Sequence, residues 1–327
     1  MTNDEPQMTL PEKLSIQVRG FDEEVAQKVG QRILEVLRKF SEWLPLQNLD
    51  GVTIAYNYAE ALRDLDRGHT GLAPLTYTQD AEVGKGVAMA PLVKREDGVK
   101  THLVLGPAVA VMFFDLENEA NINSGIETVL HELGHVVEHQ WTHQALDGVA
   151  FTPLTELLDC PLERFLHEIS DRIWSEYCAN RISTSLLNQT GDNYRKTFQD
   201  ARDTIIPRVE EARWEYNIGS ISLGEFVEVM KENLAMLLQA TGYFLGLKDG
   251  EKDRDTTNEA TERLYEESES EPLVAFHGAL QNLWEKRGNL SSFRDFLVLM
   301  EPTEKLLEEI GVYPSLTEDR QVYLHIP

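Results

Sequence analysis

The sequence has few cysteines and no long apolar run. Its 327 residues include only two cysteines, Cys160 and Cys178, so a disulfide framework is excluded and both are expected to be packed thiols. The longest apolar run covers residues 103–114 and is interrupted by Gly106 and Pro107, whereas a membrane-spanning helix needs roughly 20 apolar residues. We therefore expect no membrane segment, and a reducing cytoplasm as the location.

Basic residues are also scarce. Lys and Arg total 30 against 56 Asp and Glu, which gives a net charge of −26. Such a surface repels nucleic-acid backbones and anionic membranes, so neither is expected as a partner. Residues 1–12 are polar and acidic, lack the basic and apolar regions of a secretion signal, and are expected to form a disordered tail.

The N-terminal part of the chain alternates helix and strand signals. Apolar residues recur at helical spacing over 21–43, and the β-branched and aromatic segment 51–58 predicts a strand, followed by a short helix at 59–66. Two further strands are expected at 85–94 and 99–114. Because Pro107 cannot donate a ladder hydrogen bond, the second strand is expected to lie at a sheet edge or to be broken there.

From Ser124 onward the pattern is mostly helical. Ser124 and Glu127 form a capping box that predicts a helix to about residue 141. Further helices are expected, in order, as a short one from 152, a long one over 161–187, and others at 207–217, 222–240 (with a second capping box), 272–287, 292–300 and 303–310. Residues 249–271 are strongly acidic and are expected to form a solvated loop.

The segment 131–135 reads His-Glu-Leu-Gly-His inside the helix expected from Ser124. Positions i and i+4 share one helix face, so both imidazoles can point at a single ion while Glu132 projects beside them. Zinc suits two neutral imidazoles and one carboxylate with an open fourth position. The spacing predicts a zinc site at which Glu132 is the general base for a metal-activated water. The alternative is an ordinary amphipathic helix with two surface histidines.

A third ligand must come from elsewhere. His139 and His143 continue the i, i+4 series, but each further turn moves a side chain about 5.4 Å along the axis. We expect these two histidines to be exposed or to lie outside the ligand set. The remaining choice is a carboxylate further along the chain.

On the helix expected over 161–187, an apolar stripe turns polar at Glu176 and Asn180. A carboxylate on a buried stripe is unfavourable unless it is paired or bound to a metal, which makes Glu176 the candidate third ligand. The alternative is that Glu176 pairs with Arg172 or Arg181 on the helix surface. Asp171 is the competing carboxylate, but five residues of helix turn it about 140° away from the stripe.

Two residues of the same helix are candidates to stabilise an oxyanion, His167 and Tyr177. His167 and Asp171 also stand at i, i+4, a spacing that could hold a metal or form an acid–base pair. The alternative for that pair is a solvated helix face.

The order helix, strands, His-Glu-x-x-His helix and then Glu176-Tyr-Cys-Ala-Asn180 on a second helix resembles the minimal gluzincin metallopeptidases. The E-x-x-A-N string is most similar to that of the ImmA/IrrE-type peptidases. The resemblance covers about residues 20–190. It implies that His131, His135 and Glu176 are the zinc ligands and that Glu132 is the catalytic base. It also implies that Asn180 orients a liganding imidazole.

We therefore predict an α+β fold with a small antiparallel-rich sheet packed on zincin helices and a helical C-terminal part. The expected organisation is the tail 1–12, a zincin-like metallopeptidase domain over 13–200, and a helical region over 201–327. The predicted function is zinc-dependent hydrolysis of peptide bonds in a peptide or protein substrate. The alternatives are a metal-binding scaffold for protein interactions and a latent protease activated by a regulatory protein partner.

Overall fold

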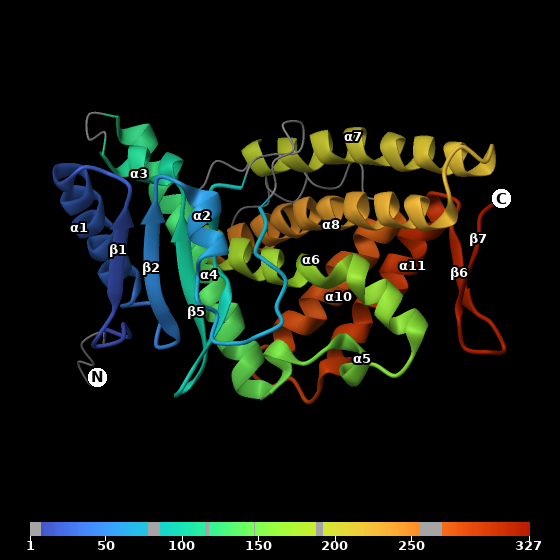
Figure 1. Ribbon diagram of the computed structural model, residues 1–327, viewed down its shortest axis with the longest axis horizontal. Helices are drawn as coiled ribbons and strands as arrows, with labels where there is room; N and C mark the ends of the chain where they lie inside the picture. The colour runs from blue at the N-terminus through green and yellow to red at the C-terminus, as the bar shows by residue number, and fades with distance from the viewer. Residues whose placement is uncertain (1–7, 78–85, 115–117, 147, 188–191, 255–269) are drawn as a thin grey trace. The chain divides into compact units, whose positions relative to one another are not determined.

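The computed structural model describes residues 8–77, 86–114, 118–146, 148–187, 192–254 and 270–327 (Figure 1). The chain divides into two compact units, an N-terminal unit of residues 1–143 and a C-terminal unit of residues 144–327. The α+β class with a helical C-terminal part is confirmed. The domain boundary expected at residue 200 does not coincide with this division, because the helix expected over 161–187 belongs to the same unit as the residues after 200.

The N-terminal unit holds a five-stranded sheet in the order β1-β2-β5-β3, with β4 also paired to β5. Strands β1, β2 and β5 run parallel, and β3 and β4 run antiparallel to β5, so the sheet is mixed rather than antiparallel-rich. Its elements are β1 (Ser15–Arg19), α1 (Glu23–Phe40), β2 (Leu49–Ala55), α2 (Tyr58–Arg63), β3 (Ala88–Met89), β4 (Leu92–Arg95), β5 (Gly98–Leu105), α3 (Pro107–Phe114) and α4 (Glu119–Ala145).

The parallel pairing of β1 with β2 follows from the helix between them. Parallel neighbours need a crossover connection, and α1 supplies it. Asp22 caps α1 by accepting a hydrogen bond from the Val25 amide at 2.9 Å, and the apolar face of the helix is fully buried at Val29 and Ile33. The sequence analysis predicted this helix but passed over the alternation of apolar and polar residues at 14–19, and for that reason the parallel pairing was missed.

The strand expected over 99–114 ends at Leu105, and Pro107 begins α3 instead. The proline is compatible with the first helical position, where its missing N–H would have no intrahelical partner. β5 pairs with strands on both sides and is therefore central, so it is broken before the proline rather than lying at an edge.

Two further expectations for this unit need correction. Helix α4 begins at Glu119 and not at Ser124, whose hydroxyl donates to the Ala120 carbonyl oxygen (3.0 Å) within the helix. The expected tail is also docked where it is described, because the Thr9 hydroxyl donates to the Ser41 carbonyl oxygen (2.9 Å). Residues 1–7 lie outside the described residues.

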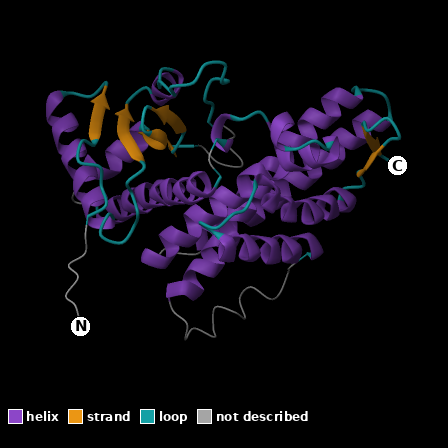
Figure 2. Cartoon of the chain, turned by 90° about the horizontal axis from the view of Figure 1, so that it is seen from below, coloured by secondary structure: helices purple, strands orange, loops and turns teal. Residues whose placement is uncertain are grey.

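The C-terminal unit consists mainly of long helices, with one hairpin near the end of the chain (Figure 2). Among the described helices, none combines the length and apolar character needed to cross a membrane. The elements are η1 (Val149–Phe151), α5 (Leu154–Leu157), α6 (Pro161–Leu186), α7 (Asp192–Asn217), α8 (Leu223–Arg254), α10 (Glu271–Lys286), η3 (Phe293–Leu299), α11 (Met300–Glu309), β6 (Tyr313–Leu316) and β7 (Val322–His325).

Two helices of this unit are longer than the sequence signals indicated. Pro207 lies inside α7 rather than at its start. Proline disfavours the interior of a helix, but tertiary packing can hold a helix together across one. The capping box at Ser222 and Glu225 is confirmed, but α8 continues to Arg254 and so includes the start of the expected acidic loop. Residues 255–269 lie outside the described residues.

Helices α6 and α8 pack at unusually close range. A Cβ built on Gly246 of α8 would lie 2.4 Å from the carbonyl oxygen of Tyr177 in α6. A Cβ built on Gly242 or Gly250 would likewise lie 2.7 or 2.6 Å from an α6 carbonyl oxygen one turn away on either side. Only glycine permits this contact, and it brings the side chains next to the glycines into reach of α6.

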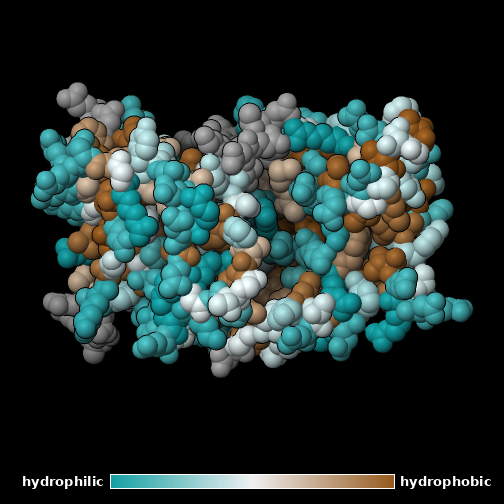
Figure 3. Space-filling model, in the orientation of Figure 1, coloured by the Kyte–Doolittle hydropathy of each residue, from teal (hydrophilic) through white to brown (hydrophobic). Residues whose placement is uncertain are grey.

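Hydrophilic side chains cover much of the face shown in Figure 3, as the net charge of −26 leads one to expect. Two groups of exposed apolar side chains in the C-terminal unit lie around the α7–α8 turn and on the β6–β7 hairpin. They are Trp214, Ile218, Leu223, Tyr313, Leu316 and Tyr323. The Asn217 side chain donates to the Pro327 carbonyl oxygen (3.2 Å), so the end of α7 lies beside the chain terminus.

Candidate metal centre

The His-Glu-x-x-His segment lies within α4, as expected. The rings of His131 and His135 meet edge to face, with 4.9 Å between their centroids. His131 and Glu132 are buried, with 9% and 6% of their surface exposed. Leu130 and Leu133 are fully buried on the core side of α4, so apolar packing fixes the rotation of the helix about its axis.

His139 and His143 continue this row of imidazoles. The ring of His139 stacks on that of His135 at 6.1 Å between centroids, and Nδ1 of His139 lies 3.0 Å from the Thr101 hydroxyl. Burial, together with the charge of His135, lowers the pKa of His139 to about 3. His139 is therefore a neutral ring in contact with a proposed ligand. Its side chain is only 18% exposed, so the expectation that it is exposed is wrong.

Glu176 lies on the face of α6 that packs against α8. It is 9% exposed, and its Oε1 accepts a hydrogen bond from Nε2 of Gln239 at 2.7 Å. Arg181 forms a bidentate ion pair with Asp253 (2.7 and 2.9 Å), so the alternative in which it pairs with Glu176 is not supported. Arg172 is exposed on α6.

Asn180 stands one turn beyond Glu176 and is completely buried. Its Nδ2 donates to the Tyr243 carbonyl oxygen at 2.6 Å, which fixes the orientation of the amide. Its Oδ1 is a buried acceptor with no hydrogen-bond partner among the described residues. Buried acceptors are nearly always paired, so this oxygen is suited to an imidazole N–H, the role that the sequence resemblance implies.

The described residues contain one group of three side chains with the geometry of a metal site. One ligand atom each of His131, His135 and Glu176 lies within 4.8 Å of the others, so the group could hold a metal ion. These are the three residues predicted from the sequence. Asp171, the competing carboxylate, is exposed on α6 and does not belong to the group.

The two oxyanion candidates have other contacts. The Tyr177 hydroxyl donates to Asp249 at 2.6 Å and receives a hydrogen bond from Arg181 at 2.6 Å, in the interior of the C-terminal unit. The ring of His167 packs edge to face on Phe293 at 4.9 Å, and burial lowers its pKa. The hydroxyl of Tyr177 is thus already engaged, so it is the less suitable of the two candidates.

Sequence reasoning missed the residues of α8 that hold the α6 side chains. Gln239 contacts Glu176 and also donates to the Tyr243 hydroxyl at 2.9 Å, while the backbone of Tyr243 holds Asn180. The one available signal was a glutamine inside the mostly apolar stretch 234–247 of α8. Its partner could not be inferred, because 63 residues separate the two in the chain.

We expect Gln239→Ala to weaken zinc binding by about 10- to 100-fold, the usual effect of removing a side chain that orients a metal ligand. The matched control is Gln281→Ala, because Gln281 bonds to Asp249 in the same unit and does not contact Glu176. Competition with a chromogenic zinc chelator measures both constants. Equal affinities for the two variants would show that Gln239 does not orient Glu176.

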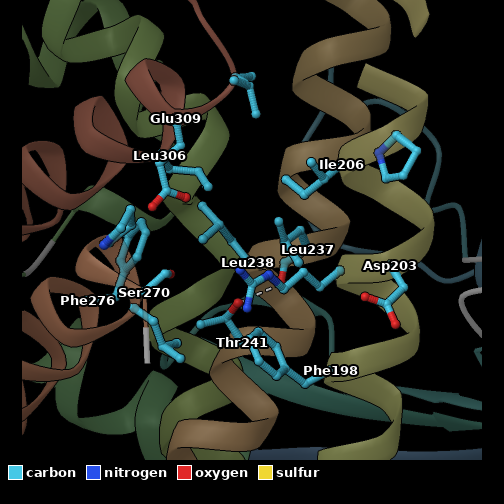
Figure 4. Close-up of a pocket in the computed structure, with 15 residues that line it drawn as sticks. Phe198, Asp203, Ile206, Leu237, Leu238, Thr241, Ser270, Phe276, Leu306 and Glu309 are labelled. Carbon is cyan, nitrogen blue, oxygen red and sulfur yellow. Dashed lines mark hydrogen bonds between the residues drawn. The ribbon is translucent and has the colours of Figure 1, made fainter. Parts of the chain in front are cut away.

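A separate cavity of about 610 Å³ lies among α7, α8, α10 and α11 of the C-terminal unit (Figure 4). Its wall combines apolar side chains, among them Leu237, Leu238 and Phe276, with polar and charged ones. Asp203 and Glu309 stand at its sides (Figure 4). None of the predicted site residues lines this cavity.

No family model matches the sequence, and no curated protein or solved structure matches it either. The chemistry of the site is therefore inferred from its own side chains.

Proposed function

We propose that this protein is a zinc-dependent peptidase of the gluzincin type, similar to the ImmA/IrrE-type peptidases. The observation that supports it most is the grouping of His131, His135 and Glu176 within 4.8 Å, with Glu132 next to His131 in α4. The group combines two imidazoles with one carboxylate, the donor set of catalytic zinc sites that keep a position open.

The surroundings of the three side chains also fit zinc. Gln239 holds the Glu176 carboxylate in place by a hydrogen bond to its Oε1. The buried Oδ1 of Asn180 supplies an acceptor of the kind that fixes the tautomer of a liganding imidazole. A zinc ion bound there would polarise the scissile carbonyl group and lower the pKa of a water molecule.

The protein's own residues then carry the proton transfers. Glu132 takes a proton from the attacking water and delivers it to the leaving amine, as a general base followed by a general acid. Its near-complete burial excludes bulk water from the carboxylate. The ring of His139 supports His135 by stacking and stays neutral, so it does not add charge beside the ligands.

A regulatory protein partner is a further part of the proposal. It is favoured by the exposed apolar residues Trp214, Ile218 and Leu223 at the α7–α8 turn, since exposed apolar clusters mark interaction surfaces.

Both cysteines are free thiols, which supports a location in the reducing cytoplasm.

Metal removal tests the proposal. Elemental analysis is expected to give about one zinc per chain, because the described residues bring one group of three potential ligand side chains together. His131→Ala and His135→Ala should lose most of this zinc, while His69→Ala, at an exposed position of the N-terminal unit, should keep it. Hydrolysis of an unfolded protein should stop on chelation and return on addition of zinc. Full zinc occupancy in both ligand variants would refute the site, and hydrolysis that survives complete zinc removal would refute the mechanism.

A further inference from the structure

A pocket of about 450 Å³ lies in the N-terminal unit, beyond the ends of β2 and β5. Its wall includes Tyr58, Tyr77, Val87, Pro107 and Ala108. The rings of Tyr58 and Tyr77 meet edge to face at 4.9 Å and give it an aromatic side. None of the described residues that line it carries a charge.

The position of the pocket is typical of a binding site. β2 and β5 are parallel neighbours, and the segments that follow them, Tyr56–Ala59 and Gly106–Ala108, both line the pocket. Ligands of parallel sheets commonly bind beyond the carboxyl ends of the strands. The volume also falls in the range of roughly 300–1,000 Å³ that is usual for small-ligand pockets.

Tyr58 connects the pocket to the proposed catalytic base. Its side chain is 6% exposed, and its hydroxyl has no hydrogen-bond partner among the described residues. Burial and then the charge of Glu132 raise the pKa of Tyr58 above its ordinary value. The aromatic side of the pocket is therefore within electrostatic range of Glu132, and both belong to the N-terminal unit.

We propose that this pocket binds a large apolar side chain, aromatic or long aliphatic, of the substrate residue next to the scissile peptide bond. The proposal rests on the peptidase function proposed above. A carbonyl oxygen of the bound peptide would accept a hydrogen bond from the Tyr58 hydroxyl and satisfy a buried donor.

The described lining of the pocket can be compared with two substrate classes, basic and apolar. A net charge of −26 by itself favours basic substrates. A basic side chain in this pocket would lose its hydration without gaining a carboxylate, because no described lining residue is acidic. The apolar and aromatic side chains of the described lining favour an apolar substrate side chain, in contrast to what the overall charge suggests.

Two tryptophan variants of α3 test this proposal. Ala108→Trp fills the pocket, whereas Val111→Trp adds the same bulk at a position on α3 that is 60% exposed and does not line it. Two peptides are compared that differ only in having phenylalanine or alanine beside the cleaved bond. The wild-type preference for the phenylalanine peptide, as a ratio of kcat/KM, should fall at least about tenfold in Ala108→Trp and stay unchanged in Val111→Trp. Ala59→Trp, at an exposed position of the lining, serves if Ala108→Trp does not fold.

The outcomes separate this proposal from the peptidase function. If the wild type cleaves both peptides equally, or if both tryptophan variants lose the preference for the phenylalanine peptide alike, the pocket does not bind the substrate side chain beside the cleaved bond. If no cleavage depends on Glu132, the peptidase function itself fails. In that case the pocket is judged by NMR titration with N-acetylphenylalanine amide, which should bind to the wild type and Val111→Trp but not to Ala108→Trp. Absence of such binding to the wild type would overturn the pocket as well.

Discussion

Replacing Glu176 by alanine is expected to weaken zinc binding by about three orders of magnitude or more. Structural zinc sites derive roughly 10–16 kcal/mol from a few ligands, so the loss of one anionic ligand removes a large share of the binding free energy. The variant would also remove one of the two acceptors of the partly buried Gln239 amide, which would keep only the Tyr243 hydroxyl. Competition with a zinc chelator at constant pH measures the dissociation constant.

The matched control for that variant is Asp171→Ala. Asp171 is the other carboxylate of α6 that sequence reasoning considered, and it is exposed and absent from the three-ligand group. We expect it to change zinc affinity by less than about twofold, since an exposed carboxylate away from the metal contributes little. If Asp171→Ala weakened binding more than Glu176→Ala, the ligand assignment and the gluzincin resemblance would both be wrong.

Glu132→Gln is expected to lower kcat by about 100- to 10,000-fold while zinc stays bound, because the amide cannot accept a proton from the attacking water. The substitution preserves the size of a side chain that is only 6% exposed, so the packing of α4 should not change. Peptide hydrolysis and elemental analysis on the same sample measure the two quantities. Loss of zinc together with activity would mean that Glu132 is needed to build the site rather than to catalyse.

The local parts of this architecture could be predicted from the sequence. The periodicity over 21–43 located α1, and the apolar stripe of 161–187 located α6 and placed Glu176 on its buried face. Both depend on spacing within one helix, which the sequence contains directly. The same is true of the pair His131 and His135, because i and i+4 share a face in any α-helix.

The parts that depend on contacts distant in the sequence were missed or misjudged. Asp249 was assigned to a solvated acidic loop, yet it is buried in α8. Although burial alone would raise its pKa, hydrogen bonds from His277 and Tyr177 and the charge of Arg181 lower it. The ionised carboxylate is stable there only because folding brings those partners together. The local composition of residues 249–271 does not indicate which distant residues they are. Gln239 escaped notice for the same reason.

Cleavage of a whole proteome tests the central claim most directly. Zinc-loaded wild-type protein and the Glu132→Gln variant are each incubated with an unfolded cell extract, and new N-termini are counted by mass spectrometry. The account predicts a set of new N-termini in the wild-type sample that is missing from the Glu132→Gln sample and from a chelated wild-type control. Identical sets of N-termini in all three samples would contradict the peptidase function.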